Sequence, residues 1–344
     1  MYRWNNDYNH GAHPAILQAL QQTNQDAFAG YGLDEWCKKG SLEIKKYLGR
    51  TDVDIHFLLG GTQANYTLIS HALRPWQSAV CADCGHINSH ETGALEHAGI
   101  KILTAPAEDG KLSAKALHEI VAAYRSSDVK EHITEPKLVY LSFPSELGTV
   151  YSKEQLQAIK QECVQNDLLL FIDGARMGYG LGAAGNDVDL KFIASLTDAF
   201  YLGGTKCGAL FGEALVIVND ALKKHFRASM KQNGGMLAKG WLLGLQFYTL
   251  FADGLYFEIT KKADAQADLI RNAFVKKGIA LCPENRTNQI FVALDREQEK
   301  ILAEKHIFEN EGYSQDGRRI VRFCTSWSTD AAEVDALIAD IEKF

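Results

Sequence analysis

Short apolar runs alternate with segments of helical periodicity along most of the 344-residue chain, and this alternation limits the fold more than any other feature. It is typical of a mostly parallel sheet whose strands are connected by flanking helices. The run Leu168-Leu-Leu-Phe-Ile172 is apolar at every position, as in a strand that is buried on both faces. We therefore predict an α/β fold, with strands over residues 55–59, 79–82, 100–103, 138–142, 168–172, 199–202 and 215–218.

Helices are predicted between these strands over residues 63–73, 91–98, 113–124 and 152–165, with Ser152 as an N-cap. The pattern changes after about residue 250, where a long amphipathic helix is followed by strands over 289–294 and 320–323 and a final helix from Asp330. We expect an N-terminal arm over residues 1–12, a large α/β domain over 13–250 and a smaller C-terminal α+β domain over 251–344.

The charge balance disfavours several classes of partner. The chain has 36 basic and 43 acidic residues without long runs of either, so a nucleic-acid groove or a basic membrane patch is not expected. The longest apolar stretch, Trp241–Phe251, is too short to cross a bilayer, and residues 1–7 lack the apolar core of a secretory signal. The seven cysteines are scattered and should be reduced thiols, so we predict a cytoplasmic protein.

Three short motifs resemble nucleotide or metal sites but lack the context that those sites need. Gly180–Gly185 fits GxGxxG, but its first glycine lies well beyond Ile172 instead of in the turn that ends the strand. Gly203–Lys206 lacks the earlier glycine of a P-loop and the hydroxyl residue after its lysine. Cys81 and Cys84 have CxxC spacing without a second pair, so we expect buried thiols and no metal site.

Three charged residues are expected to meet at one edge of the sheet. Asp173 ends an apolar strand, Arg176 follows shortly after it, and Lys206 follows the next strand through a Gly-Gly-Thr turn. Because the carboxyl ends of neighbouring strands converge on one crevice, these residues form either a structural ion-pair network or a site with a Schiff-base lysine of lowered pKa. In the second case Asp173 would pair with the pyridinium of pyridoxal phosphate, and Gly60-Gly61-Thr62 would bind the phosphate through backbone N–H groups.

Short motifs in a characteristic order run through nearly the whole chain. They are Asn6–Pro14, Tyr31–Asp34, Gly61–Asn65, His86–Ala94, Asp109–Leu112, Glu146–Val150, Ile172–Arg176, Gly203–Gly208 and Val321–Phe323. In this order and spacing the chain resembles the L-threonine aldolase and aromatic amino acid β-eliminating lyase family of fold-type I pyridoxal phosphate enzymes. The resemblance implies the fold-type I architecture, pyridoxal 5'-phosphate as cofactor, and a homodimer or homotetramer with its sites at the dimer interface.

The resemblance also assigns the cofactor-binding residues. By it, Lys206 would form the Schiff base and Asp173 would bind the protonated pyridine nitrogen, which makes the ring an electron sink. His86 would stack on the ring, and Glu91 lies close enough in sequence to orient it. Gly61 and Thr62 match the phosphate-binding pair of the family, and Thr205, beside the lysine, would add a hydroxyl.

The positions that match the substrate-binding residues are Asn6, Tyr31, Arg176 and Arg322. The two arginines would hold the substrate carboxylate, which suits the planar, bidentate guanidinium group. Tyr31 matches a tyrosine that often reaches across the dimer interface. Asn6 replaces a serine of many members, and Glu146 replaces a histidine that some members use at the substrate's β-hydroxyl.

The implied reaction is cleavage of β-hydroxy-α-amino acids, L-threonine or L-allo-threonine, to glycine and an aldehyde through the Lys206 Schiff base. His86 or Glu146, acting through a water, would remove the β-hydroxyl proton. Two alternatives stay open: another pyridoxal phosphate-dependent β-eliminating lyase or aminotransferase, and a non-catalytic relative that keeps only the fold.

Overall fold

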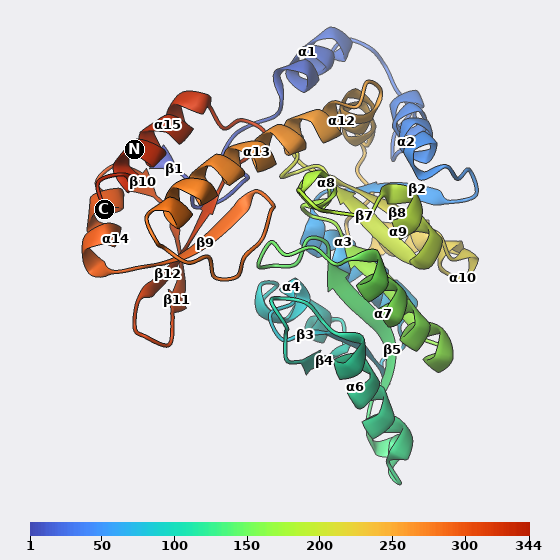
Figure 1. Ribbon diagram of the computed structural model, residues 1–344. Helices are drawn as coiled ribbons and strands as arrows, with labels where there is room; N and C mark the ends of the chain where they lie inside the picture. The colour runs from blue at the N-terminus through green and yellow to red at the C-terminus, as the bar shows by residue number, and fades with distance from the viewer.

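A seven-stranded, mostly parallel sheet forms the centre of the computed structural model, which describes all 344 residues (Figure 1). Strand β8 alone runs antiparallel to its two neighbours, β2 and β7. In their order across the sheet, the strands are β2 (Asp54–Leu58), β8 (Glu213–Ile217), β7 (Ala199–Gly203), β6 (Leu169–Asp173), β5 (Glu135–Ser142), β3 (Gln77–Ala82) and β4 (Lys101–Ala105). Each lies within a few residues of a predicted strand, so the α/β prediction is confirmed.

Apolar side chains on both faces explain why the central strands read as continuous apolar runs. On β6, Leu170 and Ile172 belong to one buried cluster, while Phe171 between them belongs to another on the opposite face. Helices cover both faces (Figure 1). They are α3 (Gly61–Ala72), α4 (His86–Ser89), α5 (Ala94–His97), α6 (Ala114–Ser126), α7 (Lys153–Asn166), α8 (Met177–Gly182), α9 (Leu190–Leu196), α10 (Asp220–Lys223) and α11 (Phe226–Gln232), with a short 3₁₀ turn at Lys130–His132.

The longest apolar stretch forms helix α12 (Trp241–Phe251), which packs against α2 (Glu35–Leu48). Gly244 is required at this contact because a Cβ there would lie 2.2 Å from the backbone nitrogen of Cys37. Helix α1 (Pro14–Thr23) also contacts α12. No helix in the structure combines the length and apolar character that a bilayer span requires.

The C-terminal part has its own sheet and its own core. The antiparallel strands β11 (Glu309–Tyr313), β12 (Arg319–Cys324) and β9 (Gln289–Leu294) form the sheet. The helices beside it are α13 (Leu255–Lys276), α14 (Arg296–Ala303) and α15 (Ala331–Ile341). The two strands predicted here are present, whereas β11 and α14 were missed.

The N-terminal residues are attached to this C-terminal part (Figure 1). Strand β1 (Tyr2–Arg3) pairs in parallel with β10 (His306–Ile307). The indole N–H of Trp4 donates to Nδ1 of His306 at 3.1 Å, and Asp340 contacts the other ring nitrogen at 2.9 Å. Residues 5–8 then run toward the carboxyl ends of the large sheet's strands. The domain boundaries at residues 12 and 250 remain predictions.

The structure shows on which helices, strands and turns the short sequence motifs lie. Gly180–Gly185 begins inside helix α8, not in a strand-to-helix turn. Gly203–Lys206 lies in a connection between two antiparallel strands, so no helix follows it as in a P-loop. Ser152 forms the predicted N-cap with a complete capping box. The helix predicted over 91–98 is present but shorter, as α5, because Gly93, at φ 72°, is its N-cap residue, and α4 before it was not predicted. All seven cysteines are free.

Candidate active site

A cleft of about 400 Å³ opens at the carboxyl ends of β5, β6 and β7. Asp173, Arg176 and Lys206 all line it, so their predicted convergence is observed. Their roles in chemistry remain predictions. The cleft is also lined by Tyr8, Gly60, Gly61, Thr62, His86, His90, Ser142, Glu146, Tyr201, Thr205 and Glu213.

Asp173 is a buried, hydrogen-bonded carboxylate at the end of β6. Its Oδ2 accepts from Asn65 Nδ2 at 2.9 Å and from the Tyr140 hydroxyl at 2.6 Å, and its Oδ1 accepts from the backbone N–H of Ala175 at 2.9 Å. Burial raises the pKa of Asp173, but the charge of His86 and these hydrogen bonds outweigh it and hold the pKa below its ordinary value. Asp173 is therefore an anion fixed at the base of the cleft, and it does not cap a helix.

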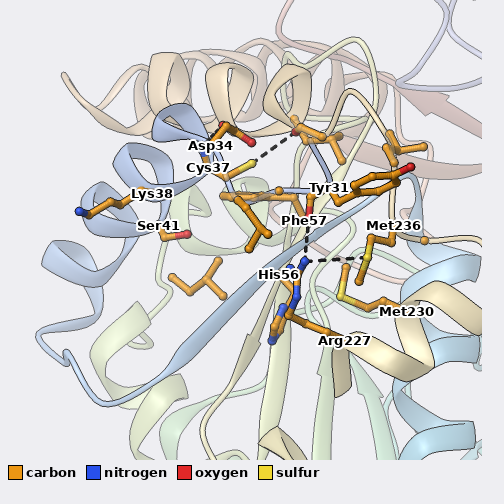
Figure 2. Close-up of a pocket in the computed structure, with 17 residues that line it drawn as sticks. Tyr31, Asp34, Cys37, Lys38, Ser41, His56, Phe57, Arg227, Met230 and Met236 are labelled. Atoms are coloured by element: carbon orange, nitrogen blue, oxygen red, sulfur yellow. Dashed lines mark hydrogen bonds between the residues drawn. The ribbon is translucent and has the colours of Figure 1, made fainter. Parts of the chain in front are cut away.

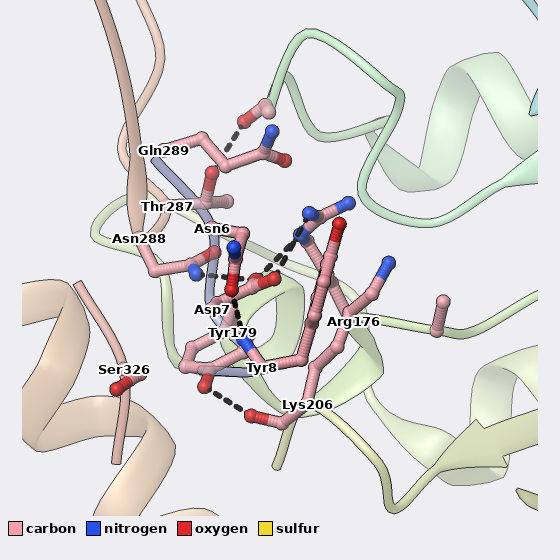
Figure 3. A network of polar contacts seen from close by, with 12 residues as sticks. Asn6, Asp7, Tyr8, Arg176, Tyr179, Lys206, Thr287, Asn288, Gln289 and Ser326 are labelled. Atoms are coloured by element: carbon pink, nitrogen blue, oxygen red, sulfur yellow. Dashed lines mark hydrogen bonds and ion pairs between the residues drawn. The ribbon is translucent and has the colours of Figure 1, made fainter. Parts of the chain in front are cut away.

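Lys206 is a partly buried amine beside this anion. Burial and the charge of Arg176 lower the pKa of Lys206, against the opposing effect of Asp7, Asp173 and Glu213. A lowered pKa gives more of the neutral amine, which is the nucleophilic form. Its Nζ lies 5.8 Å from the ring centroid of Tyr8, and both side chains extend into the same space (Figure 3).

Helix α3 begins at the cleft with its first turn uncapped by any side chain. Gly60 is its N-cap residue, and Thr62 lines the cleft. A Cβ on Gly61 would lie 2.8 Å from the hydroxyl oxygen of Tyr201, a buried atom with no hydrogen-bond partner. The backbone N–H groups of a helix start favour an anion, and the absent Cβ lets the Tyr201 hydroxyl approach this turn closely.

Two carboxylates bind His86, one at its ring and the other at its backbone. Its Nδ1 bonds Glu91 Oε1 at 2.8 Å, as predicted, and its backbone N–H donates to Glu146 Oε1 at 2.8 Å. Since a carboxylate accepts, Nδ1 carries the proton that this contact requires. The Ser142 hydroxyl also donates to Glu146 Oε1, at 2.5 Å, which leaves Oε2 available. Burial raises the pKa of Glu146.

Arg176 is paired with Asp7 (Figure 3). Its Nε and Nη2 donate to the two carboxylate oxygens at 2.7 and 3.1 Å, and Asn288 Nδ2 also donates to Asp7, at 2.9 Å. Burial acts to raise the pKa of Asp7, but the charges of Arg176 and Lys206 lower it to about 2. Asp7 thus occupies one edge of the guanidinium and leaves Nη1 for another carboxylate.

Arg322 lies on β12 beside the same N-terminal segment. Its neighbours Val321 and Phe323 are fully buried in the C-terminal core, so its side chain takes the other face of the strand, as predicted. It donates to the backbone oxygen of Asn5 at 3.2 Å and pairs with Glu311 at 3.0 Å. Two arginines from distant parts of the chain therefore both contact residues 5–7.

Comparison with known proteins identifies the family. The sequence profile described as "Beta-eliminating lyase" matches residues 10–297. The chain belongs to this family. A low specificity L-threonine aldolase from a Pseudomonas species is 30% identical to it over 338 residues, covering 96% of this chain and 94% of the relative. A solved structure of Leishmania major threonine aldolase is 41% identical, with a TM-score of 0.97, covering 100% of this chain and 99% of the other.

More distant members of the fold share the same architecture. Cystalysin from Treponema denticola, solved with a pyridoxal 5'-phosphate cofactor, is 17% identical and superposes with a TM-score of 0.73, covering 100% of this chain and 90% of the other. At this identity the likeness shows the fold alone. Together with the closer structural match, it confirms the predicted fold-type I architecture.

Three residues assigned by family resemblance, Asn6, Tyr31 and Arg322, do not line the cleft. Tyr31 lies in a separate cavity of about 230 Å³, where Arg227 donates to its backbone oxygen at 2.9 Å (Figure 2). Asn6 does not line the cleft, and its side-chain oxygen accepts from the backbone N–H of Tyr8 at 3.0 Å. Thr205 does line it, but its hydroxyl donates to Glu213 at 2.8 Å, so that proton is already in use.

Sequence reasoning missed two residues that join the members of the site. Asn65 Nδ2 bridges Asp173 and Glu91, at 2.9 and 2.8 Å. It lies one helical turn after Gly61, and this spacing on an amphipathic helix was the signal that could have found it. Asp7 follows Asn6 directly, and an acidic residue beside a predicted carboxylate-binding position could have been expected to pair with an arginine.

Proposed function

We propose that this chain is a pyridoxal 5'-phosphate-dependent carbon–carbon lyase that cleaves β-hydroxy-α-amino acids, L-threonine or L-allo-threonine, to glycine and an aldehyde. The observation that carries the proposal is that one cleft holds a lysine of lowered pKa opposite an ionised aspartate, with an arginine beside both. The names of the Pseudomonas and Leishmania relatives support the same reaction.

The residues of the cleft fit the cofactor at each of its polar ends. Asp173 would pair with the pyridine nitrogen, the start of α3 at Gly61 and Thr62 would bind the phosphate, and Lys206 would hold the cofactor covalently. The unpartnered hydroxyl of Tyr201, which lies close to Gly61, is consistent with an anion at that position. When bound, pyridoxal phosphate supplies an electron sink for the charge that develops at the substrate's α-carbon.

The substrate carboxylate would bind at the free edge of Arg176. Asp7 fixes the orientation of this guanidinium before substrate arrives, so little side-chain entropy is lost on binding. Arg322, which contacts Asn5 in the segment that also holds Asp7, would complete the carboxylate site together with Asn6. Holding the carboxylate fixes how the rest of the substrate is oriented, which is the main contribution of positioning residues to the rate.

Glu146 is the residue that we propose removes the β-hydroxyl proton, directly or through a water. Its Oε2 is available, while Ser142 and the backbone of His86 hold its other oxygen. In its neutral form, His86 would offer a second acceptor at Nε2, and its ring would stack on the cofactor. One group would then handle the proton while the other positions the cofactor.

Glu146→Gln should lower kcat/KM by about 100-fold and remove the acidic limb of its pH profile. A general base works when it is deprotonated, and burial raises the pKa of Glu146, so wild-type activity should fall as the pH decreases through that raised pKa. The measurement is kcat/KM for threonine cleavage against pH. An unchanged profile in this variant, with the acidic limb lost instead in His86→Phe, would assign the base to His86.

The reaction itself is tested by identifying its products. Purified enzyme with pyridoxal phosphate should convert L-threonine to glycine and acetaldehyde in equal amounts, as measured by amino-acid chromatography and alcohol dehydrogenase coupling. Formation of 2-oxobutanoate and ammonia would instead indicate a β-eliminating lyase, and a keto acid formed only with an amino acceptor would indicate an aminotransferase. Absence of both cofactor binding and turnover would favour a non-catalytic relative.

We further propose a cytoplasmic homodimer or homotetramer in which Tyr31 of one subunit lies near the cleft of another, with a small amino acid as its partner and no nucleic acid or membrane. The exposed ring of Tyr31, held at φ 62° outside its own cleft, supports this arrangement. The seven free thiols and the net charge of −7 support the compartment and the absence of a polyanionic partner.

A further inference from the structure

Glu213 occupies the position between the two turns that would hold the cofactor. It is the first residue of β8, which runs antiparallel between β2 and β7. In the register of the sheet, Glu213 pairs with Leu58 on one side and with Gly203 on the other. The glycine turn at 60–62 follows the first of these residues, and the turn that carries Lys206 follows the second.

The side chain of Glu213 faces into the cleft and bonds the lysine turn. Its Oε1 accepts from the Thr205 hydroxyl at 2.8 Å, and its Oε2 accepts from the backbone N–H of Gly204 at 3.1 Å. The Thr205 hydroxyl in turn accepts from the backbone N–H of Gly212 at 3.0 Å. Glu213 is buried, although it lines the same cleft as Gly60, Gly61 and Thr62.

The charges around Glu213 are unbalanced. Burial raises its pKa to about 8 and outweighs the hydrogen bonds from Thr205 and Gly204 and the charge of Lys206, which act to lower the pKa, while the charge of Asp173 acts to raise it. The other titratable groups that sense its charge are Tyr201, Cys207 and Tyr256, whose own pKa values burial raises, so they are neutral. A phosphate dianion at the glycine turn would add a second negative charge beside a buried carboxyl, and two adjacent anions disfavour each other's ionised form.

We propose that Glu213 binds the cofactor as a neutral carboxylic acid and thereby couples cofactor affinity to pH. The neutral acid has an O–H to donate toward the phosphate, which a carboxylate lacks. In this role Glu213 is a positioning residue that acts on the phosphate end of the cofactor and on the turn of Lys206. The inference rests on the proposed function only in taking pyridoxal phosphate as the occupant of the cleft.

The test uses a probe that binds the cleft without bonding to Lys206. 4-Deoxypyridoxine 5'-phosphate has the ring and phosphate of the cofactor but no aldehyde, so its Kd for the apoenzyme reports non-covalent binding alone. Between about pH 6.5 and 9.5, wild-type affinity should weaken above about pH 8, approaching tenfold per pH unit relative to Glu213→Gln, because one proton must be taken up. Glu213→Gln mimics the neutral acid and should lack this loss.

Asp264 supplies a matched control. It is another buried carboxyl, on α13 outside the cleft, and burial raises its pKa to about 9, so it titrates in the same range. Asp264→Asn should bind the probe with the wild-type pH dependence. If wild type and Glu213→Gln show the same pH dependence, the proposal is wrong.

A second measurement uses only the wild-type protein, so it does not require that a variant folds. Calorimetric titration of wild type with the probe at about pH 8.5, in buffers of different ionisation enthalpy, should show uptake of up to about three quarters of a proton per probe bound. Zero uptake would overturn the proposal. Failure of threonine cleavage with normal probe binding would contradict the proposed function and leave the role of Glu213 intact.

Discussion

Lys206→Ala should reduce threonine cleavage by about 10⁴-fold or more while leaving the protein folded. Lys206 carries the one primary amine among the residues that line the cleft, and burial and a neighbouring cation lower its pKa, so no other side chain there can form the Schiff base. The fold does not depend on the side chain, since Lys206 contributes to the core through its backbone oxygen, which accepts from the Tyr179 hydroxyl at 2.7 Å.

Two further measurements separate the loss of the amine from the loss of a charge. Lys206→Arg keeps a cation near Asp173 but has no amine of usable pKa, so it should be as inactive as the alanine variant. The visible absorption band of the enzyme-bound cofactor should disappear in both variants. Addition of a small primary amine should restore part of the rate to Lys206→Ala only. Wild-type turnover in either variant would contradict the mechanism.

The residues of the cleft that sequence could predict are those next to the ends of strands. Asp173 and Lys206 each follow an apolar run, and the geometry of a parallel sheet brings such positions together whatever the rest of the chain does. The strands themselves were predictable because β6 must be apolar on both faces. The fold class therefore follows from local patterns.

The polar contacts that tune these residues could not be predicted in the same way. Asp7 meets Arg176 because β1 pairs with β10, a contact between residues about 300 positions apart that no local pattern encodes. Asn65 meets Asp173 only once α3 packs on the sheet. Tyr31 fails to reach the cleft within one chain, as expected for a residue whose proposed site belongs to a second copy.

Asp173→Asn should lower kcat by about 10³-fold. Asparagine has nearly the same shape, but its neutral amide cannot keep the pyridine nitrogen protonated, and the cofactor then becomes a weaker electron sink. The three groups that donate to Asp173, from Asn65, Tyr140 and Ala175, would also face an amide with one acceptor oxygen instead of two. Steady-state kcat and the Kd of pyridoxal phosphate are the quantities to measure.

Tyr140→Phe distinguishes the charge of Asp173 from its hydrogen bonds. This variant removes the 2.6 Å bond from the Tyr140 hydroxyl but leaves the carboxylate, so kcat should fall by only about tenfold. Asp264→Asn makes the same Asp-to-Asn replacement at a buried position outside the cleft, where a pKa raised to about 9 keeps the carboxyl neutral, and it should retain wild-type kcat. If Asp173→Asn lost no more activity than Tyr140→Phe, the ionised carboxylate would be structural, and the ion-pair network interpretation of this cleft would be favoured over catalysis.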